Sequence, residues 1–254
     1  MKIVVVTFDE PFFIPDLFRP MMEKFSKDVK AVIVVPPKHP KKSQIKFVLE
    51  QLTLTSFPTF LLKSAIYAKE ISYLRLGLSN RFLSKIAQEK NIKVFTSNSV
   101  NSKKTSDLLK SIKPDIVITQ VPEIIDESIL ELAKKGFINK HASLLPKYKG
   151  LYPIFWALLK GEKNIGYTFH LMNNQIDSGD ILFQRVIKVS KEDSLSELYQ
   201  KVFKLAGKDL PGIVEDFDKK RLRLRKMSKI RNNYFSLPEK KDIKKFKKLG
   251  YKLN

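Results

Sequence analysis

The segment IVVVTF at residues 3–8 opens a series of short apolar segments rich in β-branched residues. Similar segments follow at residues 29–35, 92–95, 116–119 and 137–138. Segments of this length and composition predict buried strands, and stretches with helical spacing separate most of them. Strands that alternate with helices form parallel βαβ units. The sequence therefore predicts an α/β fold with a doubly wound, mainly parallel sheet.

Helix starts are predicted after Pro15, after Ser43, near Ser102 and at Asp126. Proline is favoured in a first helical turn, and short polar side chains cap free backbone N–H groups. A longer helix is expected from residue 194 to about 218.

A long, mainly helical insertion is predicted at residues 44–83. Its large apolar side chains, among them Leu61, Tyr67 and Leu74, are expected to be buried. The PPKHPKK block at residues 36–42 cannot continue a strand, because proline removes ladder donors, and is expected to be an exposed basic loop.

Several classes of protein are excluded by composition and pattern. The chain has 254 residues and no cysteine, which excludes disulfides, thiolate catalysis and Cys-ligated metals and favours a reducing compartment, the cytoplasm. The first strand is followed by DEPFFIPD, without the glycines of a dinucleotide-binding turn. The most apolar internal segment, residues 51–62, is too short for a bilayer span, so no transmembrane segment is expected.

Positive charge is concentrated near the C-terminus. The formal net charge is +22, and residues 219–254 carry 15 Lys or Arg against Glu239 and Asp242. Such charge fits either a solvated surface or an anionic partner such as a phosphorylated substrate, RNA or a membrane surface. Ile243, Phe246 and Leu249 recur at helical spacing, which predicts a docked amphipathic helix with these three residues buried.

Candidate site residues follow the predicted strand at 137–138. In FINKHASLLPKYKG, residues 137–150, Asn139 and His141 are two positions apart and face the same side of an extended chain. Asp177 lies 36 residues after His141, in QIDSGD, where a helix and a strand can return the chain to the same edge of the sheet. An Asn-x-His pair alone is a weak signal, and DSGD alone is also good turn chemistry.

The longer context is more specific. The segments INKHASLLPKYKG, PIFWALLKGEKNIGYTFH and QIDSGDILFQ together resemble the formyltransferase family that uses 10-formyltetrahydrofolate. Its members include glycinamide ribonucleotide, methionyl-tRNA and sugar-nucleotide formyltransferases. The resemblance covers roughly residues 90–215. It implies the family's mainly parallel sheet and a catalytic trio that falls here on Asn139, His141 and Asp177, with no metal.

The expected chemistry explains why these residue types belong together. A neutral amine attacks the formyl carbon, and preorganised donors stabilise the oxyanion that forms. Asn139 would supply a side-chain N–H, and His141 another or a proton. Asp177 would orient the imidazole and raise its basicity. His170 is expected to have at best a supporting role, and His39 has no evident partner.

The resemblance also implies that the folate pterin binds beside the trio. The predicted contacts are Gln120, Val121 and Ile124, after the strand at 116–119, and Ile176. Ser143 is expected to shape its loop rather than to act as a nucleophile, because no base is dedicated to it.

The formyl acceptor is expected to be a small primary amine, which can be anionic, such as a nucleotide-linked amino sugar. Too few residues follow Asp177 for the C-terminal β-barrel of the transfer-RNA enzymes, so aminoacylated initiator tRNA is the second alternative. A non-catalytic protein that binds RNA or a membrane surface is a third. The expected division is a catalytic domain at residues 1–220 and a basic extension at 221–254; the oligomeric state stays open.

Overall fold

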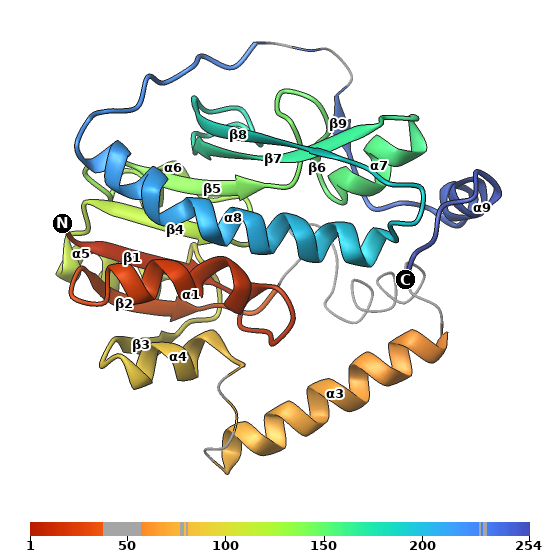
Figure 1. Ribbon diagram of the computed structural model, residues 1–254. Coiled ribbons are helices and arrows are strands. Elements are labelled where there is room, and N and C mark those ends of the chain that lie inside the picture. Colours follow the sequence, from red (N-terminus) through yellow and green to blue (C-terminus); the bar gives the residue numbers. More distant parts are fainter. Residues whose placement is uncertain (38–56, 77–78, 80, 229, 231–232) are drawn as a thin grey trace.

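The structure, a computed structural model, describes residues 1–37, 57–76, 79, 81–228, 230 and 233–254. The predicted helix start after Ser43, His39 and most of the predicted basic loop lie outside these described residues. Seven strands form the main sheet in the order β3-β2-β1-β4-β5-β7-β8 (Figure 1). They are β1 (Ile3–Thr7), β2 (Val29–Val34), β3 (Lys93–Thr96), β4 (Ile116–Gln120), β5 (Phe137–His141), β7 (Asn164–Leu171) and β8 (Ile181–Lys188).

Two further strands and eight described helices complete this part of the chain. The strands β6 (Lys149–Gly150) and β9 (Tyr234–Phe235) pair in parallel as a small second sheet. The helices are α1 (Ile14–Lys24), α3 (Phe57–Arg75), α4 (Leu83–Glu89), α5 (Lys103–Ile112), α6 (Glu127–Leu130), α7 (Pro153–Leu159), α8 (Leu195–Asp218) and α9 (Lys240–Lys248).

The main sheet is parallel from β3 to β5, and β7 and β8 are antiparallel. Chain order runs outward from β1 through β2 to β3, then resumes on the other side of β1 with β4. The boundary between β1 and β4 is therefore a topological switch point, where open α/β sheets bind ligands beyond the carboxyl ends of the strands. These features confirm the predicted doubly wound, mainly parallel sheet.

Apolar side chains fill both faces of the sheet. Along β1, Ile3 and Val5 join the core under α1, α4, α7 and α8, whereas Val4 and Val6 join the core with α5 and α6. Alternate residues of a strand point to opposite faces, so a strand buried on both sides must be apolar throughout. This requirement explains the uninterrupted run IVVV.

Helix caps decide where the helices begin. Ser102 and Ser194 cap α5 and α8 by accepting from the backbone N–H of Thr105 and Glu197, as their sequence positions predict. The predicted start after Pro15 is slightly late. The carboxylate of Glu10 accepts hydrogen bonds from the backbone N–H groups of Phe12, Phe13 and Ile14, so α1 begins at Ile14.

The sequence predicts buried apolar side chains in the insertion, but several of them are exposed in the structure. Helix α3 extends away from the body of the protein (Figure 1), and Leu61 and Tyr67 are 51% and 39% exposed. Its link to the body includes Glu70, which pairs with Arg81 and accepts a hydrogen bond from Ser79. Apolar residues on all sides of a helix predict burial, but only one side of α3 faces the protein here. Phe47 and Leu52 of the insertion lie outside the described residues.

The C-terminal helix α9 docks on α7. Phe246 is fully buried and stacks on Phe155, with ring centroids 4.6 Å apart, and Ile243 is also buried. The prediction for Leu249 is wrong, because it is 53% exposed. Helix α9 ends at Lys248, so Leu249 lies beyond the helical repeat, and the chain then turns at Gly250, whose φ is +85°.

We expect Phe246→Ala to lower the free energy of unfolding by about 3–5 kcal/mol, because it leaves a cavity between α9 and α7. Leu249→Ala is the matched control and should change it by less than about 0.5 kcal/mol, since this side chain is mostly in water. Urea unfolding of both variants measures the difference. Equal effects would contradict the docking of α9 through Phe246.

A lysine is buried in the core on the α8 side of β5. Lys140 is 3% exposed, and its Nζ lies 3.2 Å from the centroid of the Phe203 ring. Burial lowers the pKa of this amine well below its ordinary value. The cation–π contact offsets only part of the cost of removing the charge from water.

We expect Lys140→Met to stabilise the protein by about 2 kcal/mol at pH 7, because it removes the desolvation cost of the amine. The unfolded chain binds the Lys140 proton more tightly than the folded chain, so the stability of the wild type rises with pH. The gain in the variant should therefore shrink as the pH approaches about 10.4, the ordinary pKa of lysine. Unfolding curves at several pH values, with the exposed Lys104→Met as control, test this. Destabilisation by Lys140→Met would contradict it.

Candidate active site

Strand β5 brings Asn139 and His141 to the carboxyl edge of the parallel part of the sheet. Their side chains leave the same face of the strand, and Asn139 lies beside Thr119 of β4. His141 is 7% exposed, whereas Asn139 is half-buried. This geometry agrees with the strand alternation predicted from the sequence.

The segment after His141 is pinned by hydrogen bonds to β7. Thr168 Oγ1 donates to the Ser143 carbonyl oxygen at 2.6 Å and accepts from Leu145 N–H at 3.0 Å. Ser143 Oγ donates to the carbonyl oxygen of Lys147 at 2.6 Å, as expected for a residue that shapes the loop. The backbone carbonyl of Tyr148 then faces the His141 ring, 2.7 Å from Nε2.

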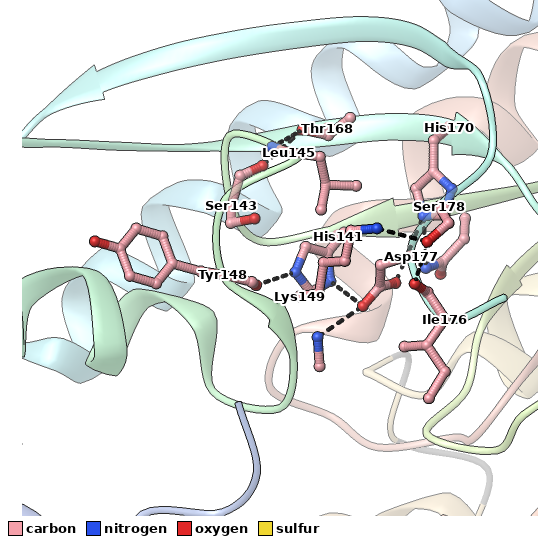
Figure 2. A network of polar contacts seen from close by, with 12 residues as sticks. His141, Ser143, Leu145, Tyr148, Lys149, Thr168, His170, Ile176, Asp177 and Ser178 are labelled. Atoms are coloured by element: carbon pink, nitrogen blue, oxygen red, sulfur yellow. Dashed lines mark hydrogen bonds and ion pairs between the residues drawn. The ribbon is translucent and has the colours of Figure 1, made fainter. Parts of the chain in front are cut away.

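Asp177 lies between β7 and β8, and its carboxylate points back at β5 and β6 (Figure 2). Oδ2 accepts a hydrogen bond from the backbone N–H of Gly150 at 2.8 Å and lies 3.4 Å from His141 Nδ1. Its backbone has φ +45°, a left-handed conformation that aspartate tolerates better than most residues. The structure thus brings His141 and Asp177 into direct contact.

His170 completes the cluster, although the sequence pattern placed it outside the trio. It lies opposite Asn139 in the β5–β7 ladder, and the Asn139 side-chain amide lies 3.3 Å from His170 Nε2. The same Nε2 lies 3.7 Å from Asp177 Oδ1. His170 Nδ1 donates to the Leu171 carbonyl oxygen at 2.8 Å, so Nε2 is free to accept from Asn139. The only sequence signal was a histidine on a strand seven positions before Asp177.

Burial and the neighbouring charges shift the pKa values of His141 and Asp177 in opposite directions. Burial lowers the pKa of His141 and outweighs Asp177 and the Tyr148 carbonyl, which favour the charged ring. Burial also opposes ionisation of Asp177, but His141, His170 and the Gly150 N–H outweigh it and hold the pKa of this carboxyl well below its usual range. The resting pair is therefore a neutral imidazole beside a carboxylate.

The geometry favours proton transfer at one atom. A carbonyl oxygen can only accept, so the neutral His141 ring carries its proton on Nε2, towards Tyr148. Nδ1 is then the basic nitrogen. A proton that arrives there gives both ring nitrogens an acceptor, the Tyr148 carbonyl and Asp177. Asn139 keeps a second N–H for another acceptor. Among the described residues, no group of three or more His, Asp or Glu side chains could hold a metal ion.

The predicted folate contacts gather at the carboxyl end of β4 and beside Asp177. Gln120 ends β4 next to Thr7, across the switch point. Ile124 and Ile176 are 45% and 39% exposed, and Val121 is partly buried against the α5–α6 core. Among the residues that the structure describes, three buried oxygens here have no hydrogen-bond partner: Thr119 Oγ1, Gln120 Oε1 and Glu123 Oε1. Buried polar groups without partners are rare and suggest that a ligand or water completes them.

The protein thus combines a mainly parallel α/β sheet with an Asn, His and Asp cluster at its carboxyl edge. The family model described as formyl transferase matches residues 1–214. The chain belongs to this formyl transferase family.

Similar proteins of known sequence include a methionyl-tRNA formyltransferase of Thermotoga neapolitana, 31% identical over 159 residues, 62% of this chain and 51% of that protein. The bifunctional polymyxin resistance protein ArnA of Wigglesworthia glossinidia brevipalpis is 40% identical over 130 residues, 49% of this chain and 20% of that protein. The chain thus spans about half or less of these two relatives.

Solved structures with the same fold include an N-formyltransferase from Helicobacter canadensis in complex with folinic acid and dTDP-3-aminofucose. It has a TM-score of 0.60 and 19% identity, over 93% of this chain and 71% of that one. Glycinamide ribonucleotide transformylase 1 from Symbiobacterium toebii has a TM-score of 0.60 and 16% identity, over 94% and 95% of the two chains.

We expect Asp177→Asn to lower the pKa of His141 further, because it removes the negative charge that favours the imidazolium. Asparagine also tolerates the left-handed backbone of this position. NMR titration of the imidazole signals measures the shift, with Asp107→Asn, an exposed carboxylate on α5, as the control. An unchanged or raised His141 pKa would contradict the contact.

Proposed function

We propose that this chain is an N-formyltransferase that moves a formyl group from 10-formyltetrahydrofolate to the primary amine of a small substrate, a nucleotide-linked amino sugar. The observation that carries the proposal is the buried cluster of Asn139, His141, His170 and Asp177 at the carboxyl edge of β5. We assign residues 1–220 to the catalytic domain and place the protein in the cytoplasm.

Each member of the cluster has a chemical task in this proposal. The amine attacks the formyl carbon, the bond from that carbon to the folate nitrogen breaks, and the amine proton ends on that nitrogen. Asn139 donates its second N–H to the developing oxyanion, and one such donor is worth about 3 kcal/mol. His141 Nδ1 accepts and returns the proton, and Asp177 and the Tyr148 carbonyl stabilise the charged ring meanwhile. His170 holds the Asn139 amide in place.

The end of β4 fits a flat polar ligand such as the pterin. It lies at the switch point of the sheet, where ligands bind in such folds. Thr119, Gln120 and Glu123 contribute buried oxygens without partners in the described structure, and Ile124 and Ile176 contribute exposed apolar surface. A pterin can hydrogen-bond the first group with its ring edge and contact the second with its face.

An amino-sugar acceptor is supported by two neighbours of the same fold, whose structures were solved with dTDP or a dTDP-linked amino sugar together with a formyl-folate. The alternative acceptor is aminoacylated initiator tRNA, which is favoured by the relatives named methionyl-tRNA formyltransferase and by the basic residues of 219–254. A non-catalytic role in binding RNA or a membrane would not account for the close arrangement of Asn139, His141 and Asp177.

We expect Asn139→Ala, His141→Ala and Asp177→Ala each to lower the turnover number at least about a hundredfold, with much smaller effects on folate affinity. The double variant with His141→Ala and Asp177→Ala should lose little more than His141→Ala alone, since the two residues act as a unit. Stopped-flow or spectrophotometric release of tetrahydrofolate measures turnover, and Asp107→Asn is the control. Near-normal turnover in His141→Ala would reject the mechanism.

The acceptor is tested by incubating the protein with 10-formyltetrahydrofolate and a panel of amines that includes dTDP-linked amino sugars, free amino sugars and charged initiator tRNA. Turnover with a sugar nucleotide supports the first acceptor. Formylation of the tRNA without turnover of any small amine would replace it with the second.

A further inference from the structure

A cleft opens on the β6 side of Asp177. It has a volume of about 550 Å³ and is lined by Lys149, Ile230, Asn233 and Tyr234. Lys149 directly precedes Gly150, the residue whose backbone N–H donates to the Asp177 carboxylate. The cleft therefore lies next to the candidate catalytic cluster, and none of the predicted pterin contacts is among its lining residues.

The walls of this cleft are tied together by backbone and side-chain contacts. β9 pairs with β6, and Asn233 Oδ1 accepts from Tyr148 N–H at 2.9 Å while its Nδ2 donates to the Pro146 carbonyl. Gly150 has φ +92°, and a Cβ there would lie 2.8 Å from Cε2 of Tyr234. The Tyr234 ring thus packs against Gly150, and the cleft joins a segment near the middle of the chain to residues 230–234.

The chemistry of the lining suits an anion with an apolar or aromatic neighbour. Lys149 Nζ donates to Ser178 Oγ at 2.5 Å, and the charge of nearby Asp177 favours the protonated amine. In the described part of the chain, no carboxylate forms a salt bridge with Lys149. Its other donors are available to a ligand. Tyr234 and Ile230 are 57% and 47% exposed, so both can contact a ring. No acidic side chain is among the lining residues.

On the basis of the proposed function, we infer that this cleft is the acceptor subsite and that Lys149 binds a phosphate-type group of the amine acceptor. The Tyr234 ring contacts the flat or apolar part of the same molecule, as an aromatic ring does with a nucleoside base. An anion held at Lys149 lies one residue from Gly150, which fixes Asp177, so binding there brings the rest of the acceptor to the catalytic cluster. Lys149 and Tyr234 are then specificity residues contributed by β6 and β9.

The lysine is tested with inorganic pyrophosphate and dTDP as probes of the full-length protein, measured by calorimetry. Lys149→Gln should weaken binding of both probes about tenfold or more, and Lys149→Arg should largely restore it. Lys147→Gln is the matched control, because Lys147 lies in the same loop but pairs with Glu162. Pyrophosphate affinity unchanged by Lys149→Gln would overturn the inference.

The Tyr234→Ala variant tests whether Tyr234 contacts the base while Lys149 binds the phosphates. It should weaken dTDP binding while leaving pyrophosphate binding unchanged, since only dTDP offers a base to the ring. Equal loss of both probes would overturn the assignment of Tyr234.

Folinic acid binding and formyl transfer provide the independent readout. Both should persist in Lys147→Gln, and folinic acid affinity should persist in Lys149→Gln. If the wild type neither binds folinic acid nor transfers formyl, the proposed function fails and the inference with it. If both activities are present but Lys149→Gln binds pyrophosphate as the wild type does, only the inference fails.

Discussion

The buried carboxylate of Asp177 is the contact on which the arrangement of the site depends. It accepts from the Gly150 backbone and faces the rings of His141 and His170, so it joins β5, β6 and β7 at one point (Figure 2). Removing a carboxylate from water is costly unless such partners replace its hydration. Because the partners here outweigh burial, Asp177 stays ionised at the end of a sheet whose core is mainly apolar.

The same contact connects the candidate catalytic cluster to the C-terminal extension. Gly150 belongs to β6, which pairs with β9, and Trp156 Nε1 donates to the Ser236 carbonyl at 2.9 Å just beyond β9. The chain then continues into α9, which packs on α7 through Phe246. A segment remote in sequence therefore supports the loop that presents a hydrogen bond to Asp177. These contacts give the C-terminal extension a structural role that does not depend on its positive charge.

Sequence reasoning succeeded where the signal was local. Short apolar segments located β1 to β5, the helix expected from residue 194 is α8, and strand alternation placed Asn139 and His141 on one face. It could not predict the contact of His170 with Asn139, because that contact depends on the antiparallel register of β5 and β7, which no local pattern contains. The predictions that Leu249 and Tyr67 are buried were wrong for a related reason. Helical spacing shows which residues share a face of a helix. It does not show where the helix ends or whether that face packs against the rest of the protein.

Net charge was the least informative of the sequence features, and the extension shows why. The basic segment after α8 runs along the edge of β8, where Arg225 pairs with Ile181 through the backbone and donates to Gln184. Lys226 forms an ion pair with Asp180. Both side chains are engaged in contacts with residues of the sheet or of the loop beside it. The number of basic residues in the extension therefore overstates the positive charge that is available to an external anion. The position of a cation is more informative than the net charge: Lys149 of β6 lines a cleft beside the candidate site, and we propose that this position lets it bind an anion.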